Sequence, residues 1–263
     1  MRDSTFPGDS YSDSPNQEKN WSSTFPYLYF LFHILKIVRH DGRLAARGEY
    51  TGKEWSEGSL ATLRLLERMG VTVTAEGMDN IDKVDGPCIF AANHMSTLET
   101  FVLPCFIQPR RNVTFVVKRS LLKYPWFGKV LAAREPVVLD RENPRDDLAA
   151  MLEGGMDRLA KGTSLIIFPQ SSRHFDFAPA GFNSIAVKLA SRAGVPVIPI
   201  ALRTDAWGVG SVVKDFGRID PKLPVRFAFG EPLHVSGKGR EEQKQIVAFI
   251  ADKLTSWNVP VVD

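Results

Sequence analysis

Short runs rich in β-branched and aromatic residues alternate with stretches of helical periodicity from residue 71 to residue 257, and this alternation constrains the fold most strongly. Seven runs have the composition of strands: Val71–Thr74, Pro87–Ala91, Val113–Val117, Pro136–Leu139, Ser164–Phe168, Val195–Ala201 and Val225–Phe229. Helices are expected over Glu54–Met69, from Asn143 to Leu159, over Phe182–Ala193 and over Arg240–Trp257. Parallel strands need crossover helices and are buried on both faces, so the chain is predicted to be α/β, with a mostly parallel central sheet covered by helices on both faces.

Composition argues against an obligate nucleic-acid binder, a disulfide-linked protein and a metalloprotein. The 263 residues carry 33 basic and 30 acidic side chains, and a net charge of +3 is too small for an obligate nucleic-acid binder. Cys88 and Cys105 lie in apolar runs without disulfide or metal spacing, which predicts two buried thiols. The histidines are His33, His40, His94, His174 and His234. Because they are scattered and form no HExxH pattern, we predict no metal site.

The N-terminal region divides into a polar and an apolar part. Residues 1–24 are polar and serine-rich, lack the pattern of a secretory signal, and are predicted to form a mobile tail. Phe25–Val38 is apolar on every side. As a helix, Tyr27–Val38 would span about 18 Å against a hydrocarbon core of about 30 Å, which is too short to cross a bilayer.

Basic residues follow this apolar run directly, as expected for a helix lodged in one leaflet with its cations at the headgroups. Residues 25–53 are therefore predicted to form a membrane-docking helical segment in front of an α/β domain over 54–263. The predicted membrane contacts are Tyr29, Phe30, Phe32, Lys36, Arg39, Trp126 and Phe127. The expected location is peripheral or monotopic on the cytoplasmic face of a membrane. The alternative is a core helix with a solvated charged end.

His94 is placed where open α/β sheets hold their ligands, in the turn after a predicted strand. Glu99 lies five residues later, and with Glu99 in the first turn of a helix its carboxylate can meet the imidazole. A carboxylate on one ring nitrogen fixes the tautomer and leaves the other nitrogen free as a base. Alternatively, Ser96 to Glu99 matches a capping box, in which Glu99 needs no histidine, and both roles can coexist on one carboxylate.

Two further turns could bind an anion. The strand Ser164–Phe168 is followed by a polar turn whose hydroxyls, backbone amides and guanidinium could cradle a phosphate. The residues of this turn assigned to substrate binding are Gln170, Ser171, Ser172 and Arg173. Arg141 ends the strand before it, and we also assign Asn93 and Lys118 to substrate binding. The alternative for the turn ending in Arg173 is a polar turn with a solvated arginine. The alternative for the region of Lys118 and Arg141 is a charged helix face next to core aromatics.

The order of these blocks is more specific than any one of them. The chain carries Asn93-His94-x4-Glu99, a strand ending in Arg141, Phe168-Pro169-x3-Arg173 and Val195-Pro-Val-Ile-Pro199. This order resembles the sequence blocks of the glycerophospholipid acyltransferases, a family that includes the 1-acylglycerol-3-phosphate acyltransferases. The resemblance covers roughly residues 71–232.

The resemblance implies transfer of a fatty acyl group from acyl-CoA or acyl carrier protein to a lysophospholipid hydroxyl, with 1-acylglycerol 3-phosphate as the expected acceptor and phosphatidic acid as the product. His94 then matches the catalytic base, Glu99 the usual aspartate, and Arg141 and Arg173 the arginines that hold the acceptor phosphate. No cofactor is implied beyond the acyl donor. Gln170, Ser171 and Asn183 depart from the family pattern, in which glutamate, glycine and lysine are usual.

Three other functions stay open at this point. The chain could act on another lysolipid, hydrolyse an acyl thioester with the same base, or bind lipid at a membrane without catalysis. Imidazole is suited to activating a hydroxyl at neutral pH, and no GxSxG turn exposes a serine, so we predict direct transfer without an acyl-enzyme.

Overall fold

The strands of the described residues form one eight-stranded sheet, seen in a computed structural model that describes residues 6, 8–12, 26–170, 172–210 and 217–262. The strands are β1 (Tyr11–Ser12), β2 (Val73–Glu76), β3 (Ile89–Ala92), β4 (Val113–Lys118), β5 (Val137–Leu139), β6 (Ser164–Ile167), β7 (Val197–Arg203) and β8 (Val225–Phe229). Their order is β1-β2-β8-β7-β3-β6-β4-β5. Neighbours are parallel except at β1/β2 and β7/β8. The prediction of a mostly parallel sheet is confirmed.

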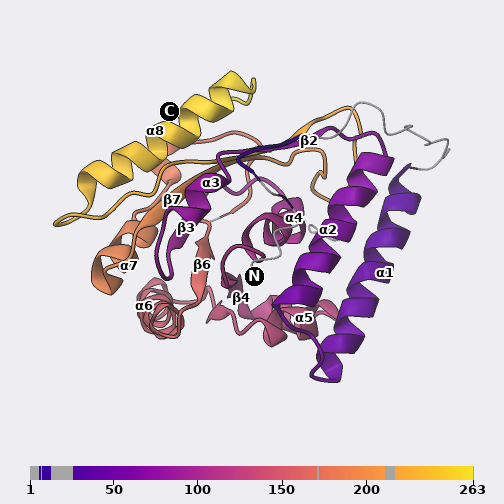
Figure 1. Cartoon of the computed structure of the whole chain (residues 1–263), viewed down its shortest axis with the longest axis horizontal. Coiled ribbons are helices and arrows are strands. Elements are labelled where there is room, and N and C mark those ends of the chain that lie inside the picture. The colour runs from indigo at the N-terminus through magenta and orange to yellow at the C-terminus, as the bar shows by residue number, and fades with distance from the viewer. Residues whose placement is uncertain (1–5, 7, 13–25, 171, 211–216, 263) are drawn as a thin grey trace.

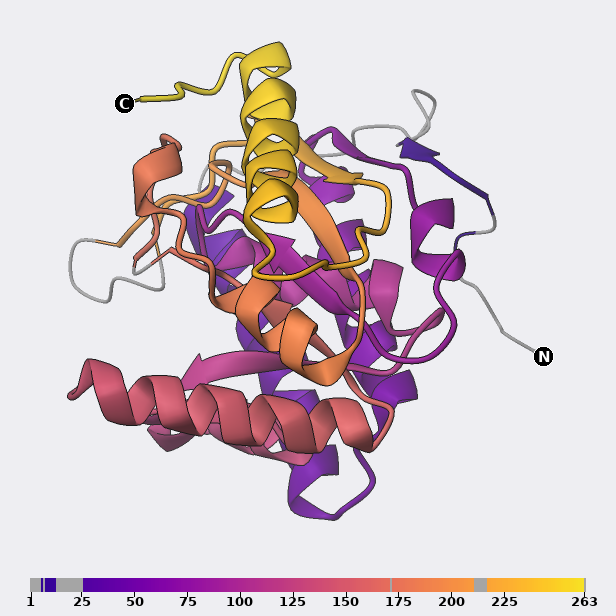
Figure 2. The ribbon, with the colours of Figure 1, turned by 90° about the vertical axis from the view of Figure 1, so that its left-hand side faces the viewer.

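Helices cover both faces of this sheet (Figure 1). One side carries α1 (Pro26–Ala46), α2 (Gly52–Arg68), α4 (Leu98–Ile107) and α5 (Phe127–Ala133). The other side carries α6 (Pro144–Ala160), α7 (Ile185–Ala193) and α8 (Arg240–Ser256), which face the viewer in Figure 2. The short elements are α3 (Asp79–Asp82) and two 3-10 turns, η1 (Arg119–Lys123) and η2 (Pro179–Gly181).

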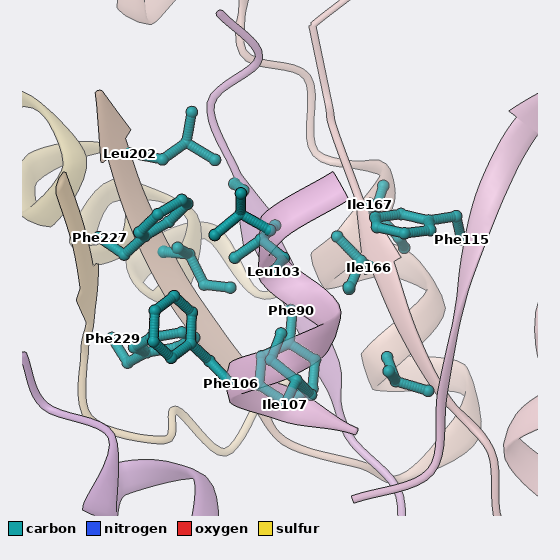
Figure 3. Packing of buried hydrophobic residues seen from close by; sticks show 14 of the residues in the cluster. Phe90, Leu103, Phe106, Ile107, Phe115, Ile166, Ile167, Leu202, Phe227 and Phe229 are labelled. Atoms are coloured by element: carbon teal, nitrogen blue, oxygen red, sulfur yellow. The ribbon is translucent and has the colours of Figure 1, made fainter. Parts of the chain in front are cut away.

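The central strands lie in the core because their side chains are apolar or small, apart from Arg203 at the end of β7. All four residues of β3 and all four of β6 are buried, and β7 is buried up to its last residue. Figure 3 shows Phe90 of β3 and Ile166 of β6 packed near Leu103 and Phe106 of α4. Each such side chain contributes roughly 1.5–3 kcal/mol when it leaves water. The core thus fixes β3 between β6 and β7, with its carboxyl end in the middle of the sheet edge.

Sequence patterns located the strands well and their ends less well. Each of the seven predicted strands is present, with ends shifted by two residues at most. Helix α6 begins at Pro144 after the Asn143 cap, as predicted, and Asn143 Oδ1 accepts a hydrogen bond from the backbone N–H of Arg145 at 3.0 Å. The helix expected from Phe182 begins only at Ile185, because Asn183 caps it through the backbone N–H of that residue.

The N-terminal residues that the structure describes are packed, so the prediction of a mobile tail over 1–24 is wrong for residues 6 and 8–12. Phe6 is buried against Tyr11 and Phe106, and Tyr11 pairs with Ala75 in the sheet. Arg110 donates hydrogen bonds of 2.8 Å to the carbonyls of Phe6 and Gly8. The remainder of the predicted tail, 1–5, 7 and 13–24, lies outside the described residues.

Helix α1 continues beyond the predicted apolar run and includes the basic residues after it. Among the helices that the structure describes, none is both long and apolar enough to cross a membrane. The inner face of α1 packs on α2, where the buried Asp41 lies against Gly58 and accepts a hydrogen bond from the Tyr50 hydroxyl at 3.3 Å. Burial raises the pKa of Asp41 to about 6, and the Tyr50 hydrogen bond opposes that rise only in part.

We predict that Asp41→Asn stabilises the protein at neutral pH. The folded-state pKa of Asp41 lies above its ordinary value of 3.8, so the buried carboxyl costs no stability at low pH. The cost grows as the pH rises from about 4 to about 6 and is complete above that. The variant should gain up to about 3 kcal/mol in free energy of unfolding at pH 8 and about half of that at pH 5. Urea denaturation at the two pH values measures the gain.

Asp85→Asn, which changes an exposed carboxyl between α3 and β3, is the matched control and should alter stability by less than about 0.5 kcal/mol. An equal gain for Asp41→Asn at both pH values would contradict the account, because it would not depend on ionisation.

Candidate active site

His94 follows β3 at the carboxyl edge of the sheet and forms a close pair with Glu99. The imidazole Nδ1 lies 2.6 Å from Oε1 of Glu99. The histidine side chain is 22% exposed, whereas that of Glu99 has no exposed surface. Glu99 lies in the first turn of α4, so the chain folds back between the two residues as their spacing predicts. With a proton on Nδ1 donated to Glu99, Nε2 remains as an acceptor, and among the described residues it has no hydrogen-bond partner.

The Glu99 carboxylate also collects hydrogen bonds from the turn before α4. The backbone N–H of Met95 donates to Oε1 at 2.9 Å, and the backbone N–H of Ser96 donates to Oε2 at 3.0 Å. The Ser96 hydroxyl donates to Oε2 at 3.2 Å. Glu99 therefore closes the turn as a capping residue and pairs with His94 at the same time, so the two interpretations of the sequence coexist.

A fifth donor to the Glu99 carboxylate comes from the residue that follows β7. The hydroxyl of Thr204, a fully buried residue, donates to Oε2 of Glu99 at 2.5 Å. Burial would raise the pKa of Glu99, but hydrogen bonds from His94, Thr204 and the Met95 backbone outweigh it and hold that pKa below its usual range. The carboxylate is therefore ionised and fixed, which is what a partner for an imidazolium requires.

The segment after β6 packs against the His94 side chain and bonds to its backbone. The ring of Phe168 stacks on the His94 imidazole, with centroids 4.3 Å apart and planes 17° apart. Oε1 of Gln170 accepts a hydrogen bond of 2.7 Å from the backbone N–H of His94. A glutamine carbonyl serves here as well as a carboxylate would, so the departure from glutamate at residue 170 keeps this contact. Gln170 is buried and holds the turn in place.

Arg173 is brought directly to the start of α4. Its guanidinium donates to the Thr97 hydroxyl, and the backbone N–H of His174 donates to the His94 carbonyl at 3.0 Å. Ser172 is exposed, and its hydroxyl lies 2.7 Å from Nε2 of His174. Ser171 lies outside the described residues. The side-chain amide of Asn183 donates to the carbonyl of Pro169 and closes the base of the turn.

Lys118 and Arg141 lie at the same edge of the sheet but farther along it. They end β4 and follow β5, the two strands beyond β6. Both side chains are exposed, and the polar contacts of the His94 ring and backbone N–H within the described residues are with Glu99 and Gln170 and not with these cations. Arg141 has φ of +63°, a conformation that is uncommon for a non-glycine residue and costs it energy.

Asn93 does not face a substrate, which corrects its assignment to substrate binding. Its side chain is buried, donates to the Leu202 carbonyl at 2.9 Å and accepts from the Leu202 backbone N–H at 2.9 Å. Both polar atoms of the amide are thus used to tie the end of β3 to β7. Asn93 positions the His94 turn, and at 2% exposure its side chain is not accessible to a ligand's phosphate.

The predicted membrane contacts separate into two groups. Phe30 is 1% exposed and packs edge-on against Trp207, with the ring centroids 4.9 Å apart. Its assignment as a membrane contact is therefore wrong. Phe32, in contrast, is 60% exposed. The other predicted contacts are Tyr29 and Phe127, which are half-buried, and Lys36, Arg39 and Trp126, which are exposed. A run that is apolar on every side gives no signal for telling Phe30 from Phe32.

Two residues of the site are absent from the predicted site residues. Phe168 belongs to the block Phe168-Pro169-x3-Arg173 but had no role assigned to its ring, and Thr204 carries no sequence signal because it lies 105 residues from Glu99 in the chain. Cys88 and Cys105 are buried as predicted, and burial raises the pKa of their thiols to about 11 and about 12. Within the described part of the chain, no three metal-ligating side chains come together.

The fold and the site define a class of protein: an α/β enzyme with a histidine–carboxylate pair at the carboxyl edge of a largely parallel sheet. The sequence profile of the family described as Acyltransferase matches residues 72–203. A 1-acyl-sn-glycerol-3-phosphate acyltransferase of Pseudomonas aeruginosa is 31% identical over 217 residues, 81% of this chain and 76% of that protein. The chain belongs to the Acyltransferase family, and the prediction of an O-acyltransferase is confirmed.

Two further proteins are similar over different shares of the chain. A chloroplast 1-acyl-sn-glycerol-3-phosphate acyltransferase of Brassica napus is 30% identical over 138 residues, which are 52% of this chain but only 38% of that protein. The crystal structure of the 1-acyl-sn-glycerophosphate acyltransferase of Thermotoga maritima has a TM-score of 0.66 at 22% identity, covering 88% of this chain and 95% of that one. This likeness shows that the two chains share a fold.

We predict that Thr204→Val, which keeps the side-chain volume and removes the hydroxyl, lowers kcat for acyl transfer about tenfold. The lost hydrogen bond to a charged group is worth about 1.5–3 kcal/mol, part of which Ser96 can replace. Thr204→Ser keeps the hydroxyl and should stay within about threefold of wild type. Steady-state kinetics of the two variants measure the difference, and equal losses in both would mean that the hydroxyl is not what Glu99 needs.

Proposed function

We propose that this protein transfers a fatty acyl group from an acyl thioester to the hydroxyl of 1-acylglycerol 3-phosphate, with His94 as general base. The observation that carries the proposal is the 2.6 Å contact between His94 Nδ1 and a fully buried Glu99, which leaves Nε2 free at the edge of the sheet. The names of the relatives from Pseudomonas aeruginosa and Brassica napus support the choice of acceptor.

The chemistry requires a base because a glycerol hydroxyl is a poor nucleophile at neutral pH. Nε2 of His94 takes the hydroxyl proton as the oxygen attacks the thioester carbonyl, and Glu99 stabilises the imidazolium that forms. The new C–O bond then replaces the C–S bond, the thiolate leaves, and the imidazolium returns its proton to that thiolate. The donor in this scheme is acyl-CoA or acyl carrier protein, and no acyl-enzyme forms.

Cations at the same sheet edge are suited to the acceptor's phosphate. Arg173 lies beside the His94 turn through its bond to Thr97. Guanidinium groups bind phosphate through two parallel hydrogen bonds, which both holds and orients the ligand. Arg141 and Lys118 extend the positive edge toward β5. In this proposal Arg173 binds the phosphate closest to the reacting hydroxyl, and the other two cations attract the ligand.

The acceptor is a lipid, and the outer face of α1 supports docking on a membrane. Leu28, Phe32 and Leu35 are each at least half exposed and lie at i, i+4 and i+7, so they form one apolar stripe. An apolar stripe exposed to water is unfavourable unless another apolar surface, such as lipid, covers it. We therefore place the protein peripherally on a membrane, on the cytoplasmic face where both candidate acyl donors are found.

We predict that His94→Ala lowers kcat for acyl transfer by roughly 10²–10⁴-fold while the fold survives, because general-base assistance is lost. The assay supplies labelled acyl-CoA or acyl carrier protein with lysophosphatidic acid, glycerol 3-phosphate or another lysophospholipid. His234→Ala, which removes an exposed histidine after β8, is the matched control and should keep wild-type activity.

Near-normal transfer by His94→Ala would remove the base assignment. Equal thioester consumption with and without an acceptor would instead identify a hydrolase, and lipid binding without turnover by either protein would identify a non-catalytic module. Trapping an acylated protein during turnover would contradict direct transfer.

A further inference from the structure

The outer face of α1 changes character along its length. At 100° per residue, Leu28, Phe32, Leu35 and Arg39 fall within an arc of about 60°, and Arg43 lies beside it. The first half of this face is therefore apolar, and the second half, on the same side of the helix, is cationic. All three apolar residues and both arginines are exposed.

Trp126 stands next to the cationic half. It precedes α5 with φ of +62° and ψ of −56°, a conformation that is a genuine outlier for a bulky residue. Gly42 of α1 packs directly on its backbone, since a Cβ at residue 42 would lie 2.8 Å from the Trp126 Cα. Despite this tight backbone contact the indole is 37% exposed. The backbone of Trp126 is therefore held in an unfavourable conformation while its ring stays at the surface. Such strain is common at functional sites, which points to a function for the ring.

Three cations converge on this ring. The guanidinium carbons of Arg39 and Arg43 lie 5.8 Å and 5.9 Å from the ring centroid, and Nζ of Lys129 lies 5.5 Å from it. Among the described residues none of the three forms an ion pair. Each cation–π contact contributes about 0.5–1 kcal/mol at an exposed site, and it is opposed by repulsion between the three like charges. An anion bound between the three cations would relieve this repulsion.

We propose that Arg39, Arg43, Lys129 and Trp126 form a clamp for the phosphate headgroup of an anionic phospholipid in the bilayer. The clamp rests on the proposed docking of α1 on a membrane and adds to it a preference for lipid charge. Its position favours a lipid over a soluble anion, because the same face of α1 continues into the apolar stripe of Leu28, Phe32 and Leu35. Acyl chains can cover that stripe while the headgroup meets the cations, with the indole at the boundary where tryptophan is enriched.

Vesicle co-sedimentation, with no acyl donor or acceptor present, tests this clamp. The wild-type protein should bind phosphatidylcholine–phosphatidylglycerol vesicles more tightly than phosphatidylcholine vesicles. Arg39→Gln/Arg43→Gln/Lys129→Gln should bind the anionic vesicles roughly 100-fold more weakly, from about one kcal/mol for each cation near the surface. Lys188→Gln/Lys222→Gln/Lys238→Gln removes the same charge from exposed sites elsewhere and should lose about threefold at most.

Tryptophan fluorescence locates the contact. Anionic vesicles should shift the emission of the wild-type protein to shorter wavelength, and Trp126→Phe should abolish most of that shift. Circular dichroism melts confirm that each variant is folded, and the three single variants replace the triple one if it melts early.

Equal losses in the two triple variants, or no loss in either, would overturn the clamp. Inorganic phosphate that releases the protein more effectively than sodium chloride of the same ionic strength would also overturn it, in favour of a site for a soluble anion. Wild-type protein that binds both kinds of vesicle equally would remove the clamp and leave docking intact, whereas binding to neither would remove both. The vesicle experiments measure binding and not turnover. They therefore test the clamp even if the proposed acyltransferase activity fails.

Discussion

A carboxylate without exposed surface has to be surrounded by donors, and the rest of the site depends on how Glu99 obtains them. Moving an ion out of water costs several kcal/mol, which only close hydrogen bonds can offset. The donors come from His94, from the turn at Met95 and Ser96, and from Thr204 at the end of β7. Displacing any of these segments would remove hydrogen bonds from the buried Glu99 carboxylate. The geometry of the His94–Glu99 pair therefore depends on the packing of the sheet.

That dependence explains residues that never touch a substrate. Asn93 joins the ends of β3 and β7, which sets the distance between the His94 turn and Thr204. Gln170 holds the His94 backbone from the β6 side, and Phe168 fixes the plane of the ring. The departure from glutamate at residue 170 is tolerated because the contact needs an acceptor and no charge.

Local sequence patterns predicted the features that depend on residues close together in the chain. The seven strands were found because buried parallel strands are continuously apolar, and the His94–Glu99 pair was found because a turn joins two residues close in sequence. Thr204 was missed because its contact with Glu99 depends on which strands are neighbours. Phe30 and Phe32 were not separated because the helix is apolar all round, and only its packing on Trp207 decides which side is buried.

The pH dependence of kcat/KM for Glu99→Gln tests the central claim most directly, that a buried carboxylate prepares His94 as a base. If Glu99 stabilises the imidazolium, the variant should lose roughly 10²-fold in kcat and the acid limb of its profile should move to lower pH, whereas Glu99→Asp keeps the charge and most of the rate. A folded Glu99→Gln protein with the wild-type rate and an unmoved acid limb would contradict the account.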